Sequence, residues 1–153
     1  MDLRQVFDDL VRFQTDLWNE IDARLRRDSD VPLGSLNVML VVERTPSCRV
    51  NDIAAALSIT IGGASQAVDR LEKRGLCGRQ PNPNDRRSQI VQLTSAGREI
   101  ATSAGRQFDQ ELVARLADPL SQAELGHLAA ALTALRTATP HQTEPQDTTK
   151  STP

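Results

Sequence analysis

The segment from Val50 to Leu93 constrains the fold of this chain more than any other part of it. Apolar residues at helical spacing predict two short helices there, followed by two strand-like segments on either side of a polar stretch. The stretch between the strands is rich in Pro, Asn and Asp and carries a basic sequence, Asn84 to Arg87, at its expected tip. A helical pair followed by a basic hairpin is typical of a domain that places one helix in a DNA groove and a β-wing beside it.

Each of the two predicted helices has a local cause. The first has apolar residues at helical spacing, Val50, Ile53, Ala54 and Leu57, and breaks off at 58–60. The second begins after Thr60, which is expected to be its N-cap, and ends before Gly75, a residue type that commonly stops helices. Its buried stripe is expected to consist of Ala64, Ala67, Val68 and Leu71.

The two strands of the hairpin are expected at 76–80 and 89–93, with a polar loop over 81–88 between them. Thr94 is expected to cap the next helix. The apolar residues of that helix recur every four positions, at Ile100, Ala104, Phe108, Leu112 and Leu116.

The flanking segments are expected to be helical and to pair two chains. The first helix has an apolar face wider than one contact needs, so part of it should bury against a second chain. A helix over 33–44 is apolar nearly all round and should be central. Ser121 and Glu124 form a capping box, after which four leucines make a short zipper-like seam: Leu125, Leu128, Leu132 and Leu135. Packing of these leucines within one chain is the alternative.

The chain of 153 residues, 39% of them hydrophobic, suits one domain over 1–138, mainly α-helical with a small β-wing. Residues 33–96 would form the winged helix-turn-helix part, and residues 1–30 and 97–138 the dimerisation helices. Residues 139–153 contain no large apolar residue and are expected to be a disordered tail. Neither a signal peptide nor an apolar run of membrane-spanning length is present, so we expect a cytoplasmic protein without a membrane partner.

Charge is unevenly distributed along the chain. The formal net charge is −2 and the pI about 5.7, which argues mildly against nucleic-acid binding. From Gln66 to Arg87, however, six basic residues stand against three acidic ones, which leaves a local charge of +3 and −5 for the remainder. Since salt limits charge effects to about 10 Å, the local charge decides phosphate contact.

The same segment resembles the MarR family of winged-helix regulators. The matching pieces are Leu57 to Thr60, Ser65 to Leu76, Asn82 to Ser88, and Val91 to Gly97. The resemblance implies a homodimeric, ligand-responsive repressor of transcription. It would bind a pseudo-palindromic duplex with a recognition helix in the major groove and the wing in the minor groove.

Three residues of the second helix are predicted to contact DNA. Ser65 and Gln66 are expected on its exposed N-terminal half, where a hydroxyl reaches a phosphate and an amide pairs with an adenine edge. Gln66 is the strongest candidate for reading sequence. Arg70 lies one turn further on and is expected to contact the DNA backbone.

The start of that helix is unusual. Thr60 and the next three residues, Ile61, Gly62 and Gly63, should present backbone N–H groups to a phosphate. The family usually has a polar residue and then a good helix starter here, whereas two glycines cost about 1 kcal/mol each relative to Ala. Either the helix start orders fully only on DNA, or the glycines admit a phosphate close to the main chain.

In the wing, the resemblance implies that Arg87 enters the minor groove and that Asp85 orients it. Arg86 would then meet a phosphate. The alternative for each is a solvated surface charge.

Ligand control and redox control are open alternatives. The resemblance implies small aromatic effectors, for which Phe7, Phe13, Trp18 and Met39 could line a pocket, although plain core or dimer packing is favoured. Cys77 is expected to be a buried small hydrophobe, while Cys48 lies in a polar turn where a regulatory thiol is conceivable.

Other classes of function find little support in the sequence. There is no cysteine and histidine cluster with the spacing of metal ligands, no glycine-rich phosphate loop and no nucleophile motif, so we expect no metal, no cofactor and no enzymatic activity. The rival readings are a thiol or oxidant sensor on the same scaffold and a winged-helix protein-interaction module.

Overall fold

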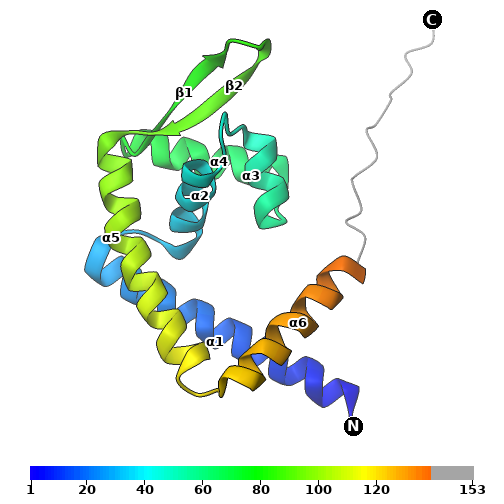
Figure 1. The fold of residues 1–153 in the computed structure, drawn as a ribbon. Helices are drawn as coiled ribbons and strands as arrows, with labels where there is room; N and C mark the ends of the chain where they lie inside the picture. The colour runs from blue at the N-terminus through cyan, green and yellow to red at the C-terminus, as the bar shows by residue number, and fades with distance from the viewer. Residues whose placement is uncertain (139–153) are drawn as a thin grey trace, which may run out of the picture. The chain divides into compact units, whose positions relative to one another are not determined.

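The computed structural model describes residues 1–138 (Figure 1), so the predicted disordered tail lies outside the described residues. The elements are α1 (Leu3–Ser29), α2 (Leu33–Arg44), α3 (Val50–Leu57), α4 (Ile61–Lys73), β1 (Cys77–Asn82), β2 (Asp85–Leu93), α5 (Ser95–Leu112), the π-helical turn η1 (Val113–Ala117) and α6 (Gln122–Ala138). The chain divides after Val113 into two compact units. The mainly α-helical fold with a β-hairpin wing is confirmed.

The central core of the first unit joins α2, α3, α4, the hairpin and the start of α5. The predicted stripe of α4 is buried as expected: Ala64, Ala67, Val68 and Leu71. Gly75 adopts a left-handed backbone with φ of 70° just beyond the end of α4, as predicted for a terminating glycine. Helix α2 spans the predicted residues and contributes six buried side chains, which confirms its central position.

A second core cluster holds α1 against α2 and α5. The C-terminal half of α1 takes part, through Leu17, Ile21 and Leu25, whereas its N-terminal half leaves large apolar side chains exposed. The carboxylate of Asp22 accepts a 2.7 Å hydrogen bond from the backbone N–H of Leu33. Because Pro32 supplies no side-chain cap, α1 caps the first turn of α2.

The wing is longer than the sequence predicted. Cys77 pairs with Leu93, the antiparallel register continues to Pro81 opposite Gln89, and an irregularity follows before Asn82 pairs with Asp85. The predicted loop over 81–88 is therefore wrong, because only residues 83 and 84 lie outside the strands.

Side-chain hydrogen bonds explain the extra length of the strands. The Asn82 carbonyl accepts from the Asn84 N–H at 3.0 Å, and its amide donates to the Ser88 hydroxyl at 2.9 Å. These bonds hold a polar segment in hairpin form that periodicity alone assigns to a loop. Pro81 is tolerated because β1 is an edge strand.

The base of the wing is fixed to α5 and to the loop before α3. The Thr94 hydroxyl donates to the Gly75 carbonyl at 2.7 Å and accepts from the Gly97 N–H at 3.0 Å, so Thr94 is the predicted N-cap. The Val91 N–H donates to the Cys48 carbonyl at 2.7 Å. A Cβ on Gly97 would lie 1.9 Å from the Leu76 carbonyl oxygen, so this contact requires glycine.

The C-terminal part of the chain differs from the prediction in one respect. Helix α5 ends at Leu112, and Leu116 lies in the π-helical turn rather than in the expected four-residue repeat. Pro119 follows closely, and a proline disfavours α-helix in the residue before it. The predicted capping box at the start of α6 is confirmed by a 2.8 Å bond from the Ser121 N–H to the Glu124 carboxylate and a 3.3 Å return bond.

Candidate nucleic-acid interface

The first turn of α4 is ordered and open. The Thr60 hydroxyl accepts a 3.0 Å hydrogen bond from the Gly63 N–H, which makes Thr60 the predicted N-cap. Gly62 and Gly63 both lie inside the helix, and neither has a positive φ. The space around Gly62 is empty, since a Cβ there would meet no heavy atom within 4 Å. The fold therefore does not require glycine at position 62.

The predicted contact residues of α4 differ in how far they are exposed to solvent. Gln66 and Arg70 are exposed, as is Lys73. Gln66 lies one helical turn after the open position at Gly62, so the two residues share a face of the helix. Ser65 is half-buried rather than exposed.

Arg79 joins the wing to α4. From β1, its guanidinium donates a 2.6 Å hydrogen bond to the Asp69 carboxylate and also bonds the Glu72 carboxylate. The Arg79 side chain is 17% exposed, against 50% for Asp69 and 41% for Glu72. Burial alone would lower the pKa of Arg79, but the hydrogen bonds and charges of the two acids outweigh it and raise that pKa.

The sequence did not single out Arg79 as a functional residue, although it lay within the local charge count. Its partners are seven and ten residues earlier, across the turn between α4 and β1. The sequence did contain a signal for it. Two acids on an otherwise basic helix would repel phosphate unless a nearby cation compensates their charge. Arg79 therefore positions the wing against α4.

Arg74 is the second cation with an internal role. Its guanidinium donates to the backbone carbonyl of Asp30 at 2.8 Å and to the Asp30 carboxylate at 3.2 Å. Asp30 has a left-handed backbone at the end of α1. Arg74 thus links the end of α4 to the end of α1.

The remaining cations are available for phosphate. Within residues 1–138, four cations of the local segment have no hydrogen bond or ion pair from their side chains: Arg70, Lys73, Arg86 and Arg87. Two come from α4 and two from β2. Since Arg79 offsets one of the two negative charges on α4, the four unpaired cations outweigh the acids that remain in the local segment.

At the wing, the resemblance implied that Asp85 orients Arg87. The Asp85 carboxylate accepts a 3.0 Å hydrogen bond from the backbone N–H of Arg87. Asp85 therefore holds the backbone at the start of β2, and the exposed Arg86 and Arg87 side chains project from a strand.

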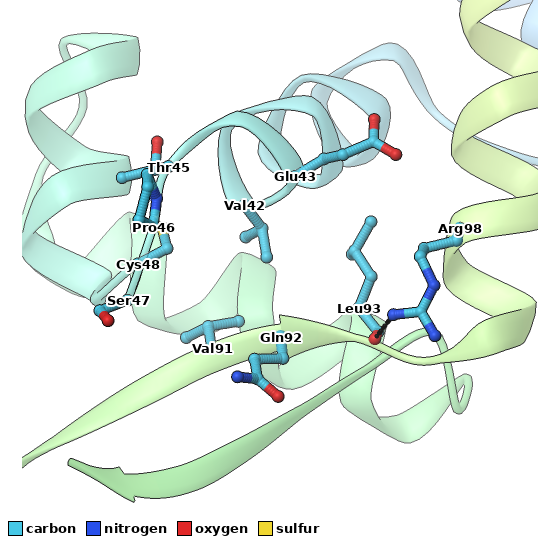
Figure 2. Close-up of a pocket in the computed structure, with 10 residues that line it drawn as sticks. All are labelled: Val42, Glu43, Thr45, Pro46, Ser47, Cys48, Val91, Gln92, Leu93 and Arg98. Atoms are coloured by element: carbon cyan, nitrogen blue, oxygen red, sulfur yellow. Dashed lines mark hydrogen bonds between the residues drawn. The ribbon is translucent and has the colours of Figure 1, made fainter. Parts of the chain in front are cut away.

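A separate groove of about 380 Å³ lies between the end of α2, the loop before α3, β2 and the start of α5 (Figure 2). At one end of it, the Arg98 guanidinium donates to the Leu93 carbonyl at 2.8 Å. The groove is lined by Val42, Glu43, Thr45, Pro46, Ser47, Cys48, Val91, Gln92, Leu93 and Arg98. None of the four residues predicted for an effector pocket lines this groove.

Those four residues are not brought together within one chain. Phe7, Phe13 and Trp18 are 64%, 44% and 42% exposed along α1. Met39 is 0% exposed and belongs to the winged-helix core. Met39 is therefore a core residue in this chain, and the three aromatics form part of the exposed face of α1.

Both cysteines are buried and reduced. Cys77 packs in the core as predicted, but Cys48 also faces the core with 1% exposure, although it lies in the expected turn. Burial, with a smaller effect of Asp52, raises the pKa of Cys48 to about 11. Burial and the charge of Glu72 raise the pKa of Cys77 to about 11. Because the thiolate is the reactive form, neither site favours oxidant sensing.

Residues 1–138 contain neither a metal-binding cluster nor a helix of membrane-spanning character. No group of three or more His, Cys, Asp or Glu side chains in that range is arranged to hold a metal ion. In the same residues, no helix combines the length and apolar character needed to cross a membrane.

The recognition-type helix and adjoining wing define a winged helix-turn-helix protein. Residues 32–89 match the model of the MarR family, which covers the winged-helix part of the chain. Among curated relatives, YfiV of Bacillus subtilis is 31% identical over 71 residues, which is 46% of this chain and 44% of YfiV. MarR of Escherichia coli is 27% identical over 99 residues, covering 65% of this chain and 69% of MarR.

Solved structures share the same fold over most of the chain. Sco3205, a MarR family transcriptional regulator from Streptomyces coelicolor in complex with DNA, has a TM-score of 0.85 and 23% identity, over 93% of this chain and 91% of Sco3205. CouR from Rhodococcus jostii RHA1, bound to p-coumaroyl-CoA, has a TM-score of 0.75 and 20% identity over 86% and 91% of the two chains.

Proposed function

We propose that this protein is a sequence-specific duplex DNA-binding regulator of transcription that represses by occupying a pseudo-palindromic operator as a homodimer. The observation that supports this most is the arrangement around Arg79. An open helix tip with an exposed Gln66 and a wing with two unpaired arginines are tied together by the half-buried guanidinium of Arg79. The DNA complex of Sco3205 is consistent with such a use of this fold.

The roles in the proposed complex follow from chemistry and position. Gln66 would pair with an adenine edge in the major groove, while Ser65 would reach a phosphate. The Gly63 N–H is occupied by Thr60, so the N–H groups of Ile61 and Gly62 are the ones left for a phosphate at the helix start.

The four unpaired cations would divide between the two grooves. Arg70, on α4, would contact the backbone beside the major groove, together with Lys73. Arg87 would enter the minor groove, held by the Asp85 contact to its backbone, and Arg86 would meet a phosphate. The expected contacts thus span both elements that Arg79 joins.

Dimerisation is proposed from exposed apolar surface. The N-terminal half of α1 exposes Leu3, Val6, Phe7, Leu10, Val11 and Phe13. A contiguous apolar face of this kind marks an interaction site, and a second copy of the same helix is its simplest partner. In α6, Leu132 and Leu135 of the predicted seam are also exposed. Two-fold symmetry would place the recognition helices about 34 Å apart.

Ligand response is the least supported part of the proposal. CouR has been crystallised with p-coumaroyl-CoA, which supports an aromatic effector in this family. In this chain Phe7, Phe13 and Trp18 would contribute to its site only where α1 meets a second chain, and Met39 would not line it. We place the protein in the cytoplasm, with the DNA that it would bind.

Titration of the full chain against a random-sequence duplex at several salt concentrations tests DNA binding as such. The proposal predicts measurable affinity at low salt that falls steeply as salt rises, because cation contacts to phosphate release counterions. Absence of affinity even at low salt would contradict it and favour a protein-interaction module.

A further inference from the structure

Ile61 is the one large side chain that the first turn of α4 presents to its surroundings. The turn has the sequence Ile, Gly, Gly, Ala. Ala64 is 0% exposed and belongs to the core, and the two glycines have no side chain. Ile61 is 57% exposed. Any side-chain contact made by this turn with a partner must therefore come from Ile61.

Ile59 and Ile61 both lie outside the core cluster, but Ile59 is the less exposed of the two, at 42% against 57%, and follows the end of α3. Ser58 has a left-handed backbone, and the Ile59 N–H donates to the Ala54 carbonyl at 3.1 Å. In this type of helix end, the residue after the left-handed one is commonly apolar because it packs on the helix. Ile61 belongs neither to the core cluster nor to the half-buried residues packed against it.

The first turn of α4 is narrow because Gly62 and Gly63 have no side chains. Gly62 has empty space around it, and both glycines have ordinary helical backbones, so neither conformation nor packing around Gly62 demands the missing side chain. The first turn also contains no acidic residue. A thin, uncharged helix end can approach the floor of the major groove closely, with Ile61 projecting from its edge.

We propose that Ile61 is a specificity-determining residue that contacts the C5-methyl group of a thymine in the major groove. An aliphatic side chain has neither donor nor acceptor, so it gains nothing from the polar base edges. The thymine methyl is the apolar group among those edges, and its contact with an aliphatic side chain removes both from water. This inference rests on the proposed DNA-binding function.

Replacement of single thymines by deoxyuridine tests the contact, because the exchange removes only the methyl group. A duplex enriched from a random pool serves as the parent, and the affinity of the full chain is measured for each single replacement. We expect one thymine in each half-site at which deoxyuridine weakens binding about fourfold, the size typical of losing one buried methyl-sized group. Replacements at other thymines should change the affinity little.

Two variants test whether the loss of affinity for deoxyuridine duplexes depends on Ile61. Ile61→Ala should bind the thymine and deoxyuridine duplexes equally, whereas Ile59→Ala, a matched change at an isoleucine two residues away, should keep the difference. Equal wild-type affinity for thymine and deoxyuridine at every position would overturn the inference, as would an undiminished difference in Ile61→Ala. Failure to enrich any duplex would instead overturn the proposed function, so the two failures are distinguishable.

Discussion

The guanidinium of Arg79, on the first strand of the wing, lies 2.6 Å from the Asp69 carboxylate on α4. A second bond to Glu72 lies one turn further along the same helix. The α4 helix and the wing are therefore held in one arrangement by Arg79. The same contact offsets one of the two negative charges that would otherwise repel phosphate.

Arg79→Gln should lower both stability and DNA affinity. It removes two charge-assisted hydrogen bonds at a largely buried side chain, for which we expect a loss of about 1 kcal/mol in unfolding free energy. Thermal denaturation measures this loss. Arg86→Gln is the matched control for stability alone and should melt like wild type, since the Arg86 side chain has no partner in the described residues. Equal melting temperatures for Arg79→Gln and wild type would contradict the positioning role.

Second-site substitutions in the Arg79→Gln variant separate the effect of charge on DNA affinity from the effect of geometry. If unpaired acids cause part of the loss in DNA affinity, Asp69→Asn together with Glu72→Gln in the Arg79→Gln background should restore part of it. The two amides carry no charge to repel phosphate. No recovery at low salt, where repulsion is strongest, would show that the acids do not matter.

Gly97→Ala should be strongly destabilising. Its Cβ would lie 1.9 Å from the Leu76 carbonyl oxygen, so either α5 or the base of the wing must move. We expect a loss of about 2 kcal/mol or more, in the range of overpacked sites. Gly62→Ala is the control, because an added Cβ there meets nothing and alanine favours helix by about 1 kcal/mol. A smaller loss for Gly97→Ala than for Gly62→Ala would refute the close approach.

The sequence predicts those elements of the fold whose causes act between residues close together in the chain. Helices α3 and α4 were predicted because caps such as Thr60 and apolar spacing act within a few residues. The ends of the wing strands were not predicted, since hydrogen bonds from the Asn82 side chain determine where the strands end. The burial of Cys48 and the partners of Arg79 depend on how segments distant in sequence pack, which no local pattern reports.

Asp22→Asn should weaken the protein at neutral pH but not at low pH. Burial raises the pKa of Asp22, but the hydrogen bonds from Arg26 and the Leu33 N–H, with the charge of Arg26, outweigh it and leave the pKa below its ordinary value of 3.8. A lowered pKa gives stability that is present above the unfolded value and lost as pH falls through the folded value.

Melting temperatures of wild type and Asp22→Asn between pH 7 and pH 2 measure this contribution. The difference should be constant down to about pH 4 and then shrink. Asp16→Asn, at an exposed position of the same helix, is the control and should follow wild type throughout. A difference that persists undiminished at pH 2 would mean that the charge of Asp22 is not what stabilises α2.

Arg87→Ala should weaken DNA binding for all sequences alike. A cation in contact with phosphate or the minor groove contributes to the salt dependence, so the slope of log affinity against log salt should become shallower by about 1 per chain. Binding titrations at several salt concentrations measure it. An unchanged slope would remove Arg87 from the interface.

Gln66→Ala should act on sequence preference instead. A bidentate amide contact to adenine is worth about 1–3 kcal/mol of discrimination, and its loss should relax one base position in each half-site. Affinities for a panel of single-base variants of the bound duplex would show this. Retained preference at every position would exclude Gln66 as a reading residue.

Selection of bound sequences from a random duplex pool tests the central claim most directly. Two recognition helices about 34 Å apart predict enrichment of a pseudo-palindrome whose half-sites are centred about 10 base pairs apart. Enrichment of no common sequence, or of a single unpaired half-site, would contradict a dimeric regulator that reads DNA through α4 and the wing.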